Sequence, residues 1–267
     1  MSEFPADVYK IVDPWESSYQ EGMAWPHKGT HVQQTQTELC PGDKICNTSK
    51  MKRVMFSGSV VKHKLGITVA HAFGRGNRFI KVECERDMAT PHIGSCRKCF
   101  RGLVQAGGRE FTADLALLDL DTRSCSVSNT VWWPKRGYGR TLQIKIYKGP
   151  EIAKDNGVMI LDQNGEFHYG CVRRTSLSDG GLQGMLGICA SEQQEVEITK
   201  LGDSGALVMS FPNNENDTVY VYGISTGIYK TPDGKTTMTI ANSLWKVIQG
   251  ISSALQVHNS PQNIDFA

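Results

Sequence analysis

The sequence predicts an all-β protein, an antiparallel barrel or sandwich, with one helix at its C-terminal end. From residue 53 onward, short β-rich runs alternate with clusters of Gly, Asn, Asp and Pro, which is the spacing of antiparallel β structure. No helical pattern separates these runs, although the parallel strands of βαβ units would need one. A sustained helical pattern follows only after the last run.

The composition supports one or two packed lobes and argues against several classes of partner. Of the 267 residues, 39% are hydrophobic and 21% are charged, which is enough apolar side chain for a core. The net charge of +2 creates no field that would attract nucleic acid or an anionic membrane. No apolar stretch is long enough to span a bilayer, and residues 1–10 lack the pattern of a secretory signal. We therefore expect an intracellular, cytoplasmic protein with no nucleic-acid or membrane partner.

The chain divides into an irregular extension and a β-rich body. Residues 1–50 contain four prolines and polar runs with no period of 2 or 3.6. The expected strands cover residues 54–61, 65–70, 79–83, 115–120, 141–147, 158–161, 195–199, 206–209, 219–225 and 236–240. Asn242 is the expected cap of a helix over residues 243–255, whose apolar positions recur at helical spacing.

Three short strings carry groups that together can perform nucleophilic catalysis. His71 follows the run 65–70, Asp114 introduces an apolar run, and Ser204 lies in a tight glycine-flanked turn before a strand. A serine hydroxyl becomes nucleophilic when an imidazole takes its proton, and the imidazole needs a carboxylate to fix its tautomer. Each string alone is an ordinary strand end or turn, but their order and their positions beside β-runs predict a catalytic triad.

These strings resemble the landmarks of the chymotrypsin-like serine peptidases. The family's patterns appear as Val69-Ala70-His71, Asp114-Leu-Ala-Leu-Leu and Gly202-Asp-Ser-Gly205. The stretches Ser57-Gly-Ser-Val-Val and Tyr222-Gly-Ile-Ser-Thr-Gly227 look more like the intracellular, viral and heat-shock branches than like the digestive enzymes.

The resemblance, which covers about residues 56–255, implies a double antiparallel β-barrel with a C-terminal helix and an active site in the cleft between the barrels. The first barrel would span residues 51–130, and the second barrel and the helix residues 141–267, joined by a linker at 131–140.

The resemblance also implies roles for individual residues. The protein would be a serine endopeptidase in which His71 is the general base, Asp114 the orienting carboxylate and Ser204 the nucleophile that forms an acyl-enzyme. The backbone N–H groups of Gly202 and Ser204 would form the oxyanion hole. The expected partner is a protein or peptide substrate, and no cofactor is expected.

Specificity follows from the same resemblance. In the family, the residue six before the serine floors the pocket for the side chain that precedes the scissile bond, and here it is Ile198. With Thr199 and Thr236 nearby, this implies cleavage after small or medium neutral residues, including polar ones such as Gln or Thr. The substrate backbone would pair with the segment Ser225-Thr226-Gly227.

The eight cysteines are expected to be free thiols, because no signal peptide is visible and Phe73 stands where secreted members of the family carry a half-cystine. Two N-glycosylation sequons, at Asn47 and Asn216, instead favour a secreted protein.

Four residues form a candidate zinc set, Cys84, His92, Cys96 and Cys99. Unligated thiols are the favoured interpretation, so no metal is predicted. A redox function of the C-x-x-C pair is disfavoured, because the βαβ context of thioredoxins is absent.

Two questions stay open at this stage. In secreted members of the family, activation cleavage frees a new N-terminus that pairs with the aspartate before the serine, and this sequence shows no counterpart of that N-terminus. Asp203 therefore either pairs with a Lys or Arg, or belongs to an enzyme that is active without cleavage. Two other functions compete with a peptidase. An α/β-hydrolase esterase would need the order Ser, Asp, His and a glycine where Ala206 stands. A catalytically inactive binding module of peptidase fold would keep the triad without an organised oxyanion hole.

Overall fold

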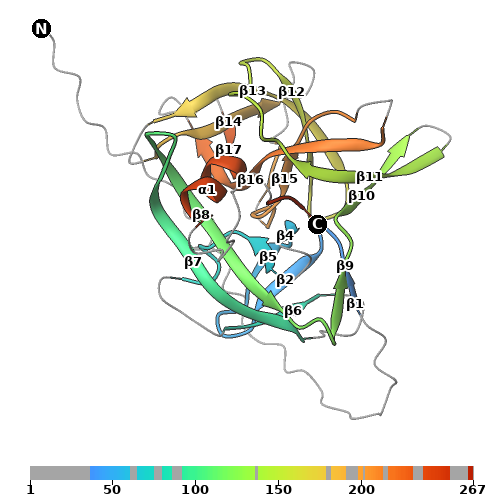
Figure 1. Cartoon of the computed structure of the whole chain (residues 1–267). Coiled ribbons are helices and arrows are strands. Elements are labelled where there is room, and N and C mark those ends of the chain that lie inside the picture. The colour runs from blue at the N-terminus through green and yellow to red at the C-terminus, as the bar shows by residue number, and fades with distance from the viewer. Residues whose placement is uncertain are drawn as a thin grey trace, which may run out of the picture.

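The computed structural model describes residues 37–60, 65–74, 80–85, 92–135, 138–178, 182–190, 198–200, 202–212, 216–230, 237–252 and 264–266. It confirms the predicted all-β class. Within these residues, a closed six-stranded barrel and a second antiparallel sheet make up the body, and one short helix lies near the C-terminal end (Figure 1).

The N-terminal half forms a seven-stranded sheet in the order β3-β2-β6-β7-β8-β5-β4. Its strands are β2 (Lys44–Asn47), β3 (Lys52–Met55), β4 (Gly58–Val60), β5 (Leu65–Thr68), β6 (Ile80–Cys84), β7 (His92–Ala106) and β8 (Arg109–Leu120). All of its pairings are antiparallel. The long β7–β8 hairpin extends along one side of the molecule (Figure 1).

The C-terminal half forms the closed barrel, in the order β16-β15-β12-β13-β14-β17, with β17 pairing back onto β16. Its strands are β12 (Gly157–Leu161), β13 (Phe167–Leu177), β14 (Met185–Ala190), β15 (Leu207–Met209), β16 (Thr218–Lys230) and β17 (Thr237–Ser243). The hairpin of β10 (Thr130–Lys135) and β11 (Tyr138–Ile146) joins this sheet through a parallel pairing of β11 with β16.

Two segments contain strands where the sequence predicted an irregular extension and a linker between the barrels. Before residue 51, β2 belongs to the first sheet, and β1 (Thr37–Leu39) pairs in parallel with β9 (Cys125–Val127). Most of the stretch 131–140, expected as a linker, lies in the β10–β11 hairpin. β1, β2 and β9 have three or four residues and β10 is an edge strand, and such strands give little period-2 signal. The exact domain boundaries stay a prediction.

The two halves share one apolar core. Buried side chains of the first sheet, such as Ile67 and Leu117, belong to the same cluster as Leu207 and Val221 of the barrel. A second cluster fills the interior of the closed barrel. Because the core crosses from one half to the other, the residues at their junction are held by both.

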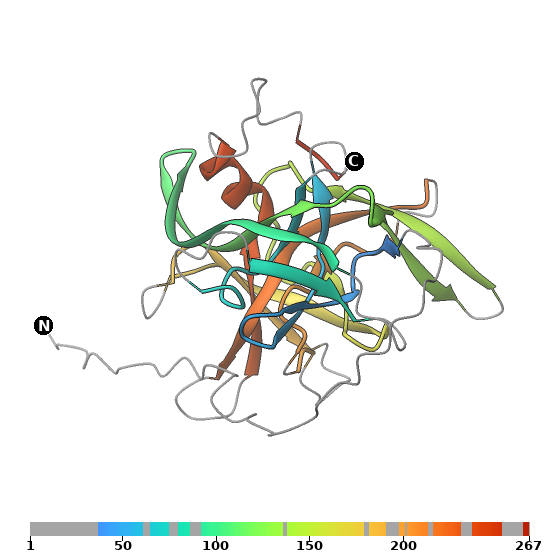
Figure 2. The ribbon, with the colours of Figure 1, turned by 90° about the horizontal axis from the view of Figure 1, so that it is seen from below.

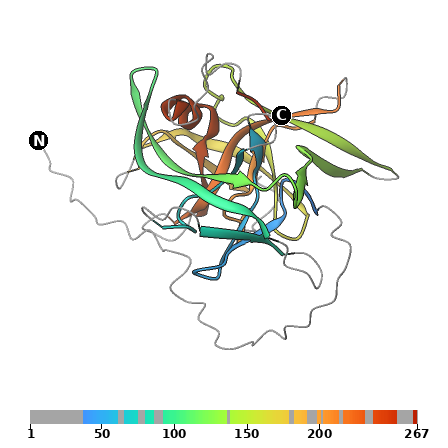
Figure 3. The same ribbon diagram turned by 60° about the horizontal axis from the view of Figure 1, so that its bottom comes forward.

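The helix α1 (Leu244–Gly250) is shorter than expected and begins differently. Its N-cap is Ser243, so the prediction that Asn242 caps it is wrong. Asn242 pairs with Ile224 of β16, and its side chain turns to the other half of the molecule instead. Figures 2 and 3 show α1 beside the β7–β8 hairpin, against which it packs. No helix among the described residues is long and apolar enough to cross a membrane.

Candidate active site

The end of β5 and the middle of β8 bring His71 and Asp114 together. The two carboxylate oxygens of Asp114 engage the same residue: Oδ1 accepts the backbone N–H of His71 at 2.8 Å, and Oδ2 lies 2.6 Å from His71 Nδ1. This double contact fixes both the backbone and the ring of the histidine. With Nδ1 facing the carboxylate, Nε2 is the ring nitrogen available to exchange a proton.

The turn that carries His71 is anchored in the core. Ala70, Ala72 and Phe73 are fully buried, and the Asn47 side-chain amide donates a hydrogen bond of 2.8 Å to the carbonyl of Ala72. Asn47 itself has no exposed surface. The buried Asn47 side chain therefore ties the turn that carries His71 to β2.

Asn242 ties Asp114 to the second half of the molecule. It is completely buried, and its Nδ2 donates a hydrogen bond of 2.9 Å to the backbone carbonyl of Asp114. The sequence analysis assigned Asn242 to a helix cap and missed this contact. The missing signal is a tertiary one, because the two residues are 128 positions apart.

Ser204 lies in the tight turn of residues 202–205, here called the serine turn, and is only 6% exposed. Its carbonyl accepts the N–H of Met55 at 2.8 Å, and the N–H of Gly205 donates to the carbonyl of Ser225 at 2.8 Å. The Met55 carbonyl in turn accepts the hydroxyl of Thr68, three residues before His71, at 2.7 Å. The serine turn is therefore held against the strand that delivers the histidine.

The two glycines of the serine turn have a structural reason. Gly205 has φ of +97°, and a Cβ there would lie 2.3 Å from the Met55 carbonyl oxygen. Gly202 has φ of +102°, and a Cβ there would lie 2.7 Å from the Gln163 side chain. Both positions combine a backbone conformation that disfavours other residues with a close approach. Any side chain at Gly205 would push the turn away from β3.

Asp203 has backbone partners in place of the Lys or Arg considered above. Its Oδ2 accepts the N–H of Lys200 at 2.6 Å, and its Oδ1 accepts the N–H of Gln163 at 3.0 Å. Burial raises the pKa of this carboxyl, and the two N–H donors work in the opposite direction. Asp203 thus fastens the serine turn to the β12–β13 loop.

The hydroxyl of Ser204 and the expected oxyanion donors make no hydrogen bond that the described part of the chain provides. The N–H groups of Gly202 and Ser204 are thus not consumed by the fold. Catalytic hydrogen bonds are often long before substrate binds and tighten in the complex with substrate. The predicted roles of Gly202 and Ser204 stay predictions.

Of the three residues expected to set specificity, two are described, and both are buried. Ile198 is 6% exposed and packs in the core of the closed barrel, where a Cβ on Gly170 would lie 2.5 Å from its Cδ1. Thr199 is buried, and its hydroxyl pairs with that of Thr239 at 2.7 Å. The sequence analysis did not name Thr239. Thr236 lies outside the described residues.

The segment expected to pair with substrate lies on β16, beside the serine turn. Ser225 is buried, and its N–H donates to the carbonyl of Ala206 at 2.8 Å. The register with β17 shifts between Ser225 and Gly227, which makes Thr226 a β-bulge. The role of this segment in binding stays a prediction.

The candidate zinc ligands do not gather into one site. Among the residues that the structure describes, one group of His, Cys, Asp or Glu has its ligand atoms within 4.8 Å of one another: Asp162, Glu166 and His168. These residues lie in the β12–β13 hairpin, where Asp162 accepts hydrogen bonds from the backbone of Glu166 and the ring of His168. Burial alone would raise the pKa of Asp162, but these and other hydrogen bonds lower it.

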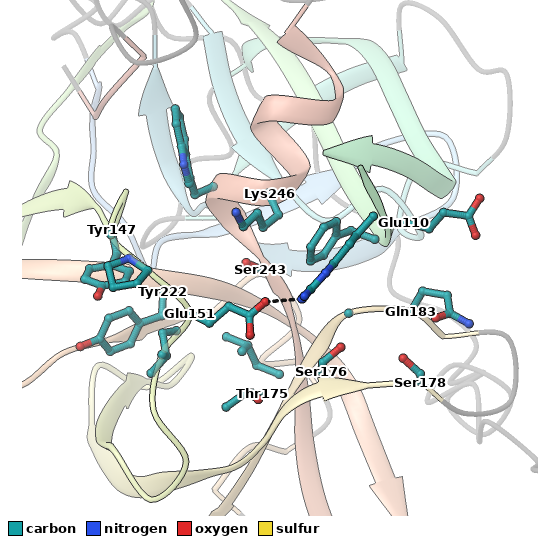
Figure 4. Close-up of a pocket in the computed structure, with 18 residues that line it drawn as sticks. Glu110, Tyr147, Glu151, Thr175, Ser176, Ser178, Gln183, Tyr222, Ser243 and Lys246 are labelled. Atoms are coloured by element: carbon teal, nitrogen blue, oxygen red, sulfur yellow. Dashed lines mark hydrogen bonds and ion pairs between the residues drawn. The ribbon is translucent and has the colours of Figure 1, made fainter. Parts of the chain in front are cut away.

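A separate cavity of about 440 Å³ is lined by residues of β8, β13 and the start of α1. Figure 4 shows the side chains that line it. Glu151 and Lys246 face into it, and Glu151 forms an ion pair of 2.6 Å with Arg109. The cavity is lined by none of His71, Asp114 and Ser204. It is therefore a different place from the candidate active site.

Comparison with known proteins supports the fold. No model of a known protein family and no curated protein matches this sequence. A solved Nocardiopsis protease aligns with 78% of this chain and 93% of its own at 14% identity, with a TM-score of 0.50. A serine protease specific for glutamic acid, which uses a histidine triad in substrate binding, aligns with 86% of this chain and 100% of its own at 15% identity, with a TM-score of 0.52. The chain therefore has the fold of the chymotrypsin-like serine proteases.

Proposed function

We propose that the protein is a serine endopeptidase. The observation that carries the proposal is the double contact of Asp114 with His71, at both the backbone N–H and Nδ1. A structural histidine needs no such arrangement, whereas a general base needs its tautomer and its ring orientation fixed. The fold, shared with serine proteases, and the anchored serine turn support the same conclusion.

The proposed reaction begins when His71 Nε2 takes the proton of the Ser204 hydroxyl, while the oxygen attacks the carbonyl carbon of the scissile bond. The N–H groups of Gly202 and Ser204 would stabilise the oxyanion, each donor contributing about 3 kcal/mol. His71 then gives its proton to the departing amine. Water, activated in the same way, releases the acid from the acyl-enzyme and restores Ser204.

The proposed substrate is a protein or peptide with a small or medium neutral residue before the scissile bond. The buried hydroxyls of Thr199 and Thr239 support this proposal. They can accept or donate a hydrogen bond, but they offer no charge to compensate a buried ion. A series of peptides that differ only at this residue tests it, because a tenfold preference in kcat/KM for a charged residue would contradict it.

A catalytically inactive binding module is the second candidate function. It is favoured by one observation: within the described ranges, Ser204 Oγ forms no hydrogen bond to His71 Nε2. Such a protein would bind peptides in the same cleft without cleaving them.

We further propose a reducing, intracellular location, with which the eight unbridged cysteines agree.

The test is digestion of a proteome-derived peptide library by the wild-type protein and by Ser204→Ala. The matched control is Ser126→Ala, since Ser126 is an exposed serine of β9 outside the site. The proposal predicts cleavage by the wild type and the control, and loss of all but a trace with Ser204→Ala. Binding of peptides without cleavage by any of the three proteins would favour the inactive module.

A further inference from the structure

Cys96 and Cys99 of β7 form a close pair of thiols, with their sulfur atoms 3.4 Å apart. Residues three apart on a regular strand point to opposite faces of the sheet, so their sulfurs would not meet. In β7, however, the register with β8 shifts between Cys96 and Lys98, which makes Arg97 an extra residue. This β-bulge resets the alternation and turns both sulfurs to the same side.

The two thiols are chemically unequal. Cys96 is fully buried in the core, whereas Cys99 is only partly buried. The hydrogen bond from Cys96 lowers the pKa of Cys99, and the positive charges of Arg101 and Lys50 lower it further against burial and Asp114. The same hydrogen bond and burial raise the pKa of Cys96. Cys99 is thus the better thiolate, and the more accessible one.

We propose that Cys96 and Cys99 are an oxidant-sensitive dithiol, which peroxide converts to an intrachain disulfide with Cys99 reacting first. The Cys99 thiolate attacks one oxygen of hydrogen peroxide, which leaves a sulfenic acid and releases hydroxide. The thiol of Cys96 then attacks that sulfur, and the sulfenic oxygen departs as water. Overall, two thiols and one peroxide give one disulfide and two waters, and a dithiol reductant reverses the change.

The geometry needs only a small movement for this closure. A disulfide requires a sulfur–sulfur distance of about 2.05 Å, so the pair must approach by little more than 1 Å. A bulge can absorb such a shift more easily than a regular ladder, because Arg97 is the extra residue at that point. The proposal concerns β7 alone and does not depend on peptidase activity.

Other cysteines are less suited to the reaction. Burial raises the pKa of Cys46 and of Cys125 to about 11, which leaves little thiolate at neutral pH. Cys171 and Cys189 stand directly opposite each other on β13 and β14. Burial raises the pKa of Cys189, and no hydrogen bond joins the two sulfurs in the described structure. This second pair is therefore a matched control.

The test treats the reduced, full-length protein with one equivalent of hydrogen peroxide, blocks remaining thiols with N-ethylmaleimide, and maps disulfides by mass spectrometry without reductant. Trypsin cuts after Arg97 and Lys98, so a bond between the two cysteines joins separate peptides. The expected product is that linked pair, with an intact mass about 2 Da lower than the reduced protein before blocking. Dithiothreitol should restore the original mass.

Variants make the result specific. Cys99→Ser should lose the disulfide, Cys171→Ser should keep it, and Cys96→Ser should stop at a sulfenic acid on Cys99 that dimedone traps. Melting curves verify that each variant is folded. Where a variant does not fold, the disulfide map of the wild-type protein still tests the proposal. A first disulfide at any other position, or a Cys99 that resists peroxide, would overturn the proposal.

Discussion

Gly205→Ala tests whether the serine turn depends on its close contact with β3. A Cβ at this position would lie 2.3 Å from the Met55 carbonyl oxygen, about 0.7 Å closer than the shortest real contacts, at a φ of +97°. The positive φ costs about 1–2 kcal/mol and the steric overlap about 1–3 kcal/mol. We therefore expect a loss of about 2–5 kcal/mol in the free energy of unfolding.

The expected catalytic effect is similar in size to the effect on stability, since a 100-fold loss in rate corresponds to about 2.7 kcal/mol. Relief of the clash must displace the turn by most of an ångström, and a misplacement of that size costs about 100-fold in rate. Gly108→Ala is the matched control, since Gly108 has φ of +76° and nothing within 4 Å of an added Cβ. Urea unfolding and kcat/KM on one peptide should be measured for both variants. If Gly205→Ala matches Gly108→Ala in both measurements, the proposed anchoring of Ser204 is refuted.

Three further predictions concern buried polar residues of the site and of the β12–β13 hairpin beside it. Asn242→Ala leaves the carbonyl of Asp114 without its donor, so urea unfolding should show a loss of about 1–3 kcal/mol. Asp203→Asn turns an amide NH₂ toward one of two N–H donors, so kcat/KM should fall about tenfold or more, and an unchanged value would contradict the role of Asp203. Asp162 has a pKa below its ordinary 3.8, so it stabilises the fold fully above that pH, and the contribution is lost as pH falls through the lowered value. Unfolding curves should therefore show Asp162→Asn as less stable than wild type at pH 7, with the difference shrinking below pH 3.8.

The sequence predicts the fold class well because its strands are short, apolar and bounded by turn residues. Besides the short strands noted above, it misses β7, β13 and β14, and for β7 and β13 the physical reason is visible. In β7, charged residues and Gly94 and Gly102 interrupt the period-2 pattern, and the bulge at Arg97 resets it. In β13, register shifts after Val172 have the same effect.

For the candidate site, local patterns predict the chemical groups but not what holds them. The proximity of His71 and Asp114 follows from strings that each carry a recognisable pattern. Asn242 and Thr239 carry no such signal, because each acts through one tertiary hydrogen bond with a distant partner. For Asp203, backbone N–H groups serve as partners, and sequence patterns do not show where backbone donors lie.

The central claim is that Ser204 is a nucleophile activated by His71. A fluorophosphonate probe reacts with an activated serine and leaves a stable adduct, which peptide mass spectrometry assigns to one residue. The account predicts one adduct per chain, on Ser204, in the wild type and in Ser126→Ala, and none in His71→Ala. A folded wild-type protein that takes up no probe, or takes it up at another residue, would contradict the claim.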